Sequence, residues 1–184
     1  MRHPAIIDML AACIVFATYS ADADAQCAID PPFSISGAVS ANPPAGLGQS
    51  FVACQTGLVT RISFSVLEPS SGPIRLGLQH GTDLTAPRHA QSVILDAGLN
   101  TIVLDAPFRV TQGTLYSFGL LPTSGTIEVR YDDDSPHTDG SIIQSNGTAS
   151  TPRPGDLIFR VEIAPSAPGS TISSTWGAIK GLYR

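Results

Sequence analysis

The sequence predicts an all-β protein built as a two-layer antiparallel β-sandwich. Only 14% of its 184 residues are charged, and it contains 17 Gly and 15 Pro. This composition disfavours a helical bundle and is typical of short strands joined by turns. Between residues 49 and 163, apolar and polar side chains alternate in short runs, and no run of ten or more residues has a clean helical period. Regular short strands of this kind indicate a sandwich rather than alternating βαβ units.

The first 25 residues have the pattern of a secretory signal peptide. Arg2 supplies the positive end, residues 9–17 are mostly apolar, and small residues at Ala23 and Ala25 precede Gln26. The apolar run is shorter than the about 20 residues that cross a bilayer. We therefore expect cleavage after Ala25 and no transmembrane segment. An alternative is the lipobox-like sequence Leu10-Ala11-Ala12-Cys13, in which Cys13 would be lipidated.

Residues 26–48 are rich in Pro, Gly, Ala and Ser, which predicts an irregular N-terminal arm or an edge-strand region. The expected mature chain holds two cysteines, Cys27 and Cys54. An even number of cysteines in an exported chain predicts a disulfide between them. Two free thiols are the alternative, whereas metal ligation is disfavoured because two isolated cysteines lack zinc-type spacing.

About nine strands are expected between residues 49 and 163. Residues 59–67 illustrate the pattern, because Ile62, Phe64 and Val66 alternate with polar residues. Strands with one apolar face bury that face between two sheets. The expected core is Phe51, Ile62, Phe64, Val66, Leu76, Leu78, Val103, Phe118, Val129, Phe159 and Val161.

The C-terminal part divides into a linker and a tail. Residues 164–175 are rich in Pro, Ser, Thr and Gly, which predicts an extended linker. In residues 176–184, Trp176, Ile179 and Tyr183 would share one face of a helix, with Lys180 and Arg184 off that face. Nine residues with two glycines do not hold a helix alone in water, so we expect a partner to bind the aromatic face of this tail.

Four segments carry a resemblance to a known family. They are Gly48-Gln49-Ser50-Phe51, residues 57–64, residues 113–118, and the closing strand at residues 156–161. In order and spacing they resemble the choice-of-anchor domains of exported proteins, most closely the R type. The resemblance implies a jelly-roll-like sandwich, secreted or displayed at the cell surface, with no defined catalytic activity. The ending Trp-Gly-x-Ile-Lys-x-x-Tyr-Arg also resembles a C-terminal motif of predicted exported bacterial proteins.

The acidic segment after residue 131 is the candidate metal site. Asp132, Asp134 and Asp139 supply oxygen ligands of the kind that Ca²⁺ prefers. The spacing is not that of an EF-hand, because no Gly follows Asp134 at the turn and no terminal Glu closes the loop. A solvated acidic turn is the competing interpretation.

The motifs of common enzymes are weak in this sequence. Glu68, Glu128, Asp132 and Glu162 are the carboxylates available for glycoside hydrolysis, but no aromatic cleft accompanies them. His80, His89 and His137 could act as a catalytic base, but the sequence has no Gly-x-Ser-x-Gly motif to supply a serine nucleophile. For sugar stacking, Tyr116 and Tyr131 are available, and Trp is absent outside the tail.

These features lead us to expect a non-catalytic, exported β-sandwich that acts as a structural or interaction module. Its tail would serve as a sorting or docking signal. The alternatives are a carbohydrate-binding module with a structural calcium and, third, a small hydrolase. The formal net charge of −5 and a single lysine, Lys180, disfavour nucleic-acid binding. The expected location is extracytoplasmic, either secreted or at the cell surface, with the periplasm as an alternative.

Overall fold

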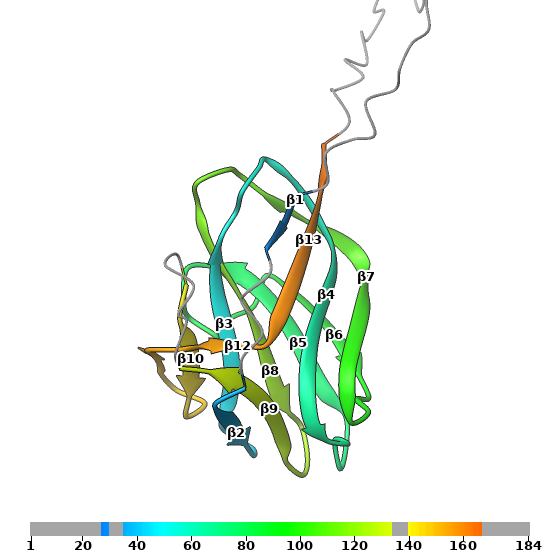
Figure 1. The fold of residues 1–184 in the computed structure, drawn as a ribbon, viewed down its shortest axis with the longest axis vertical. Coiled ribbons are helices and arrows are strands. Elements are labelled where there is room, and N and C mark those ends of the chain that lie inside the picture. Colours follow the sequence, from blue (N-terminus) through cyan, green and yellow to red (C-terminus); the bar gives the residue numbers. More distant parts are fainter. Residues whose placement is uncertain (1–26, 30–34, 134–139, 167–184) are drawn as a thin grey trace, which may run out of the picture.

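The computed structural model describes residues 27–29, 35–133 and 140–166. Within them the chain forms two antiparallel β-sheets that pack face to face, which confirms the predicted β-sandwich (Figure 1). None of the described residues forms a helix, so the part of the chain that the structure describes holds no helix able to cross a membrane.

The first sheet is centred on the long strand β4. Its main path runs β1-β13-β4-β9-β12, with β2 added to β9 and β7 added to β4. The strands are β1 (Cys27–Ile29), β2 (Gly37–Ala41), β4 (Gly57–Glu68), β7 (Gly98–Val110), β9 (Ile127–Asp132), β12 (Asp156–Leu157) and β13 (Phe159–Pro165).

The second sheet has the order β11-β10-β3-β8-β5-β6. Its strands are β3 (Gly46–Val52), β5 (Ile74–His80), β6 (His89–Val93), β8 (Leu115–Pro122), β10 (Ile142–Ser145) and β11 (Ser150–Arg153). The hairpin of β10 and β11 therefore lies at one edge of this sheet, and β6 lies at the other.

Three phenylalanines join the two sheets at the centre of the core. Phe64 of β4 and Phe159 of β13 come from the first sheet, and Phe118 of β8 comes from the second. The ring centroid of Phe118 is 6.1 Å from that of Phe64 and 5.7 Å from that of Phe159. Aromatic pairs at these separations add to the stabilisation that burial provides.

The prediction that Val103 belongs to the core is wrong. Val103 is 62% exposed, whereas its neighbour Leu104 is 6% exposed and belongs to the core. Residues 101–104 read Thr-Ile-Val-Leu, so three adjacent apolar side chains hide the period of two that would assign each to a face. The strand is shifted by one residue from the expected phase, and Val103 points to solvent.

The described residues form thirteen strands, whereas about nine were expected between residues 49 and 163. The additional short strands are β1, β2, β11 and β12. Strands β1 and β2 and the start of β3 lie within residues 26–48, for which an irregular arm or an edge-strand region was predicted, and β13 continues to Pro165. Ile29 and Val39 of this N-terminal range are buried in the core, which explains why so Pro- and Gly-rich a stretch joins the sheet.

A loop at residues 81–88 covers part of the outer face of the second sheet. Leu84 of this loop is fully buried and lies over a row in which Gly48 pairs with Gly119. A Cβ atom added at Gly119 would lie 3.0 Å from a methyl carbon of Leu84, so the absent side chain makes room for the loop. The Thr85 hydroxyl and backbone N–H donate to Asp83, which lowers the pKa of that exposed carboxyl.

A disulfide joins Cys27 to Cys54, as the sequence predicts. It ties the three-residue strand β1 to the segment that follows β3. Because both sulfur atoms are used in this bond, neither cysteine is a free thiol or a metal ligand.

Candidate functional site

The acidic residue Asp132 lies at the end of β9 and is fully buried. Its Oδ1 accepts a hydrogen bond from the Ser36 hydroxyl at 3.2 Å, and its partner across the ladder is Asp156 of β12, which is also fully buried. The other two predicted calcium ligands, Asp134 and Asp139, lie outside the described residues. The calcium site therefore stays a prediction, with Asp132 as an inward-facing rather than a solvated carboxylate.

A buried glutamine organises this polar region, and the sequence did not single it out. The Gln49 amide donates to Asp156 Oδ1 at 2.6 Å and to the Ser50 carbonyl at 3.1 Å, and its Oε1 accepts from Leu157 N–H at 2.9 Å. Gln49 is fully buried in β3, so its side chain links the second sheet to β12 of the first. The one available signal is that Gln49 lies in phase with the apolar Leu47 and Phe51 of β3, which predicts a buried position.

We expect Gln49→Leu to lower the free energy of unfolding by about 2–4 kcal/mol, because it leaves buried polar groups of Asp156 and Leu157 without this partner. Urea unfolding followed by fluorescence or circular dichroism measures the loss. Gln112→Leu, at an exposed turn position, is the matched control and should change stability by less than about 0.5 kcal/mol. If Gln49→Leu and the control had equal stability, the buried hydrogen bonds of Gln49 would not stabilise the fold as proposed.

Two of the carboxylates available for glycoside hydrolysis come together on the first sheet. Glu68 of β4 and Glu128 of β9 are ladder partners, and both line a hollow of about 260 Å³ with Pro69, Ser71 and Thr126. Cross-strand neighbours share a sheet face. No group of three or more His, Cys, Asp and Glu side chains suited to a metal ion occurs among the described residues. The structure thus brings two of the four carboxylates of the hydrolase alternative together; Asp132 is buried, and Glu162 is paired with Arg61 and Arg160.

The tyrosines considered for sugar stacking are used in packing. Tyr116 is 7% exposed, and its hydroxyl accepts a hydrogen bond from Thr111 N–H at 3.0 Å. Tyr131 packs against the core, and the Arg153 guanidinium carbon lies 5.5 Å from its ring centroid. Tyr116 therefore presents no ring face for a sugar, and Tyr131 is half-buried.

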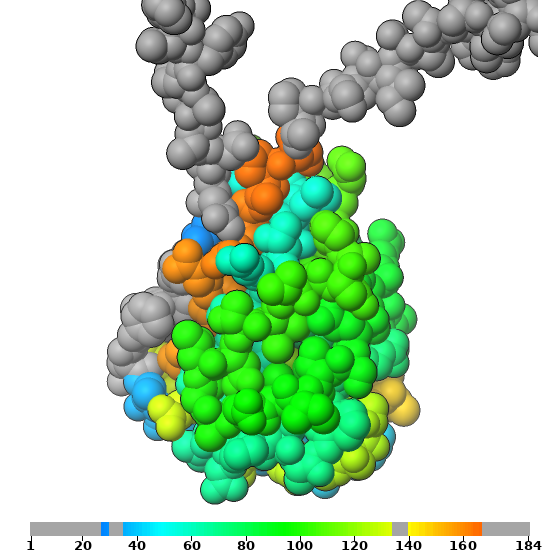
Figure 2. All heavy atoms as spheres, turned by 90° about the vertical axis from the view of Figure 1, so that its right-hand side faces the viewer, coloured from blue at the N-terminus to red at the C-terminus, as the bar shows by residue number. Residues whose placement is uncertain are grey.

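Exposed apolar side chains gather along β7 and the neighbouring part of β4. Leu99 is 74% exposed and Val103 62%, and both point outward from the first sheet. Leu99 pairs with Ser65, two residues before Leu67, which is 39% exposed. We call Leu67, Leu99 and Val103 the β7 strip. Figure 2, seen from the side on which β7 lies, shows this part of the chain in green as an open surface.

The free edge of β7 is partly closed by a side chain. The Gln91 amide of β6 donates to the Val103 carbonyl at 3.2 Å, and its Oε1 accepts from Asp105 N–H at 3.0 Å. A side-chain amide that both donates and accepts in this way replaces the peptide group of an adjacent strand. His89 lies on the same strand as Gln91, and its Nε2 atom is 3.1 Å from Asp105 Oδ1. Addition of another strand along this edge would have to displace Gln91.

The remaining candidate residues fall outside the described part of the chain. They are His137 and the tail residues Trp176, Ile179, Lys180, Tyr183 and Arg184. His80, which is described, packs edge-on against Tyr116 with ring centroids 5.5 Å apart.

Comparisons with known proteins support the fold alone. No protein-family model and no curated protein sequence matches this chain. Among solved structures, the chain is similar to the clostridial cysteine protease Cwp84 after propeptide cleavage, with a TM-score of 0.54 and 10% sequence identity. The match covers 79% of this chain and 41% of that one. Because the chain spans less than half of that protease and shares so little sequence with it, the match carries the sandwich fold and not an activity.

Proposed function

We propose that this protein is a non-catalytic, exported interaction module that contacts a protein partner through the β7 strip. The C-terminal tail acts as a sorting or docking signal in this proposal. The observation that carries it is the exposure of Leu99 and Val103 on one face of a thirteen-residue edge strand. Exposed apolar side chains that share one face of a strand are typical of surfaces that bind other molecules.

The partner engages side chains rather than the strand edge. Gln91 already bonds Val103 and Asp105, which protects the edge from pairing with another strand. The outer face next to the β7 strip also carries the exposed Thr101, whose hydroxyl shares a hydrogen bond of 2.9 Å with that of the buried Ser63. This mixture of apolar groups and hydroxyls suits an uncharged protein surface.

Other partner classes fit this surface less well. Anionic lipids and nucleic acids are bound by clusters of Lys and Arg. The chain has 10 such residues against 15 Asp and Glu, and Arg61, next to Val103, is 3.7 Å from Glu162. A protein partner therefore matches the charge of this region better than an anionic polymer or membrane.

Export of the chain is supported by the disulfide and by the resemblance to choice-of-anchor domains. Disulfides persist in oxidising compartments and are rare in the cytosol. The signal-like residues 1–25 and the bond between Cys27 and Cys54 agree on an extracytoplasmic location.

The test is retention of the purified, labelled chain from Gln26 onward on intact cells of the producing organism. We expect the double variant Leu99→Ser/Val103→Ser to lose at least about tenfold in retention, equivalent to about 1.4 kcal/mol. Ile35→Ser is the matched control, because Ile35 is 59% exposed and lies outside the β7 strip. Protease treatment of the cells should abolish binding. Equal retention of both variants, or retention on protease-treated cells, would overturn the proposed partner surface.

The tail is tested separately by expressing the protein with and without residues 176–184. Cells producing the shortened chain should release it to the medium or leave it in another compartment. Unchanged localisation would remove the sorting role and leave the β7 strip untouched.

A further inference from the structure

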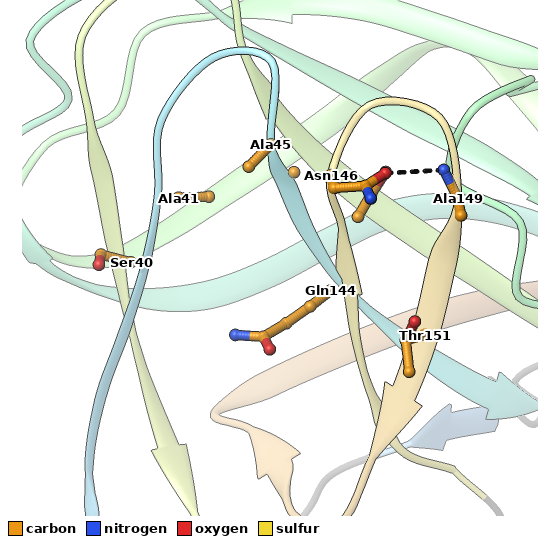
Figure 3. A pocket seen from close by; sticks show the side chains of 9 residues that line it. Ser40, Ala41, Ala45, Gln144, Asn146, Ala149 and Thr151 are labelled. Carbon is orange, nitrogen blue, oxygen red and sulfur yellow. Dashed lines mark hydrogen bonds between the residues drawn. The ribbon is translucent and has the colours of Figure 1, made fainter.

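A pocket lies at the edge of the sandwich opposite to β6. It has a volume of about 340 Å³ and opens between β2 of the first sheet and the β10–β11 hairpin of the second (Figure 3). The lining residues are Ser40, Ala41, Ala45, Gly46, Gln144, Ser145, Asn146, Ala149 and Thr151. The β7 strip is on other strands, so the pocket belongs to a different surface from the proposed partner contact.

The pocket exists because small residues stand where large ones would fill the space between the sheets. Ile142 of β10 is in the core, and alternation along the strand turns Gln144 to the same side. Thr151 pairs with Gln144 across the hairpin and therefore shares that face. Facing them are Ala41 and Ala45, whose methyl groups leave the gap open, and Figure 3 shows the Gln144 amide reaching into it.

Hydrogen bonds hold the hairpin wall of the pocket in place. Asn146 Oδ1 accepts from Thr148 N–H at 3.0 Å, from the Thr148 hydroxyl at 2.9 Å and from Ala149 N–H at 2.9 Å. Gly147 N–H donates to the Ser145 hydroxyl at 3.1 Å. With its oxygen used in this way, Asn146 retains its Nδ2 group as a donor. A wall that is ordered before binding lowers the entropy cost of taking up a ligand.

The chemistry of the lining is uncharged and polar. Ser40, Gln144 and Thr151 are exposed, and their side chains make no hydrogen bond to the described residues. They offer two hydroxyls and one amide, and Ala41, Ala45 and Ala149 add apolar contact. The described residues that line the pocket include no Lys, Arg, His, Asp or Glu, so none of them neutralises a phosphate, a carboxylate or an amine. We infer that this pocket binds a neutral saccharide, with amide and hydroxyl groups pairing with sugar hydroxyls.

The size of the pocket limits the ligand to a small unit. Ligand pockets usually measure about 300–1,000 Å³, and this one is at the lower end. One sugar ring, or the terminal ring of a longer glycan, fits that volume better than a buried chain. For so small a ligand in an open site we expect a dissociation constant of about 1 mM.

The inference is tested by NMR titration of the ¹⁵N-labelled mature chain with neutral mono- and disaccharides of glucose, galactose, mannose and N-acetylglucosamine. At least one should shift the amide signals of residues 144–151, and glucuronic acid should not bind more tightly. Gln144→Ala should weaken binding at least about tenfold. Ala45→Leu, which fills the pocket without removing a polar group, should abolish it. Gln112→Ala, at an exposed glutamine in the turn before β8, is the matched control.

Three results would overturn the inference. They are the absence of shifts with every neutral sugar at concentrations well above 1 mM, tighter binding of glucuronic acid, and unchanged binding by both pocket variants. The retention experiment on the β7 strip is independent of these results, because Leu99 and Val103 do not line the pocket.

Discussion

Replacing Phe118 by alanine is expected to lower the free energy of unfolding by about 3–5 kcal/mol, the range for large-to-small changes at buried aromatic positions. Phe118 is fully buried, and its ring contacts Phe64 and Phe159 of the opposite sheet. The substitution removes apolar surface from the core and leaves a cavity between two rigid sheets. Chemical unfolding of both proteins in urea, extrapolated to water, measures the difference.

Phe108→Ala is the matched control for this change. Phe108 is also an aromatic residue on a strand, but it is only partly buried at the margin of the core, with its ring 5.8 Å from that of Tyr116. Its loss should cost clearly less than the loss of Phe118. If both variants lost the same stability, the three-phenylalanine contact would not be the centre of the core.

Removing the disulfide through Cys27→Ala/Cys54→Ala is expected to lower the free energy of unfolding by about 3.5 kcal/mol in the chain-entropy model. The bond closes a loop between residues separated by 27 positions, and its loss enlarges the unfolded ensemble. The folded state is affected too, because β1 has only three residues and, among the described strands, pairs with β13 alone. Without the bond, β1 is held by this short ladder and by the burial of Ile29 in the core.

Unfolding of the wild-type chain with and without reductant provides the control for the disulfide. The reduced wild type should match the double variant, since both lack the same covalent link. A double variant within about 1 kcal/mol of the oxidised wild type would show that the bond adds little to the stability of the domain.

The surface assignments differ in what they require of the protein. The β7 strip needs only exposed apolar side chains that are held on a rigid strand, and Leu99 and Val103 meet that condition. The pocket at the opposite edge needs an ordered hairpin wall, which Asn146 supplies through its three accepted hydrogen bonds. A module that binds a protein on one edge and a glycan on the other would join two components of a cell surface.

Alternation along the chain was sufficient to predict the sandwich and most of its core. The period of two around Ile62, Phe64 and Val66 can be satisfied only by strands with one buried face. The pairing of Cys27 with Cys54 was also predicted from the sequence, because these two cysteines are the ones left if the chain is cleaved after Ala25. These features depend on local pattern and composition.

The sites depended on contacts between residues far apart in the chain. Gln49 meets Asp156, Glu68 meets Glu128, and Ala45 faces Gln144 only because strands from different parts of the sequence become neighbours. The sequence also did not show that Val103 is on the exposed face, since it lies within three adjacent apolar residues that do not alternate with polar ones. Local sequence determined which side chains could be buried, and the pairing of distant strands decided which polar groups met and where the space between the sheets stayed open.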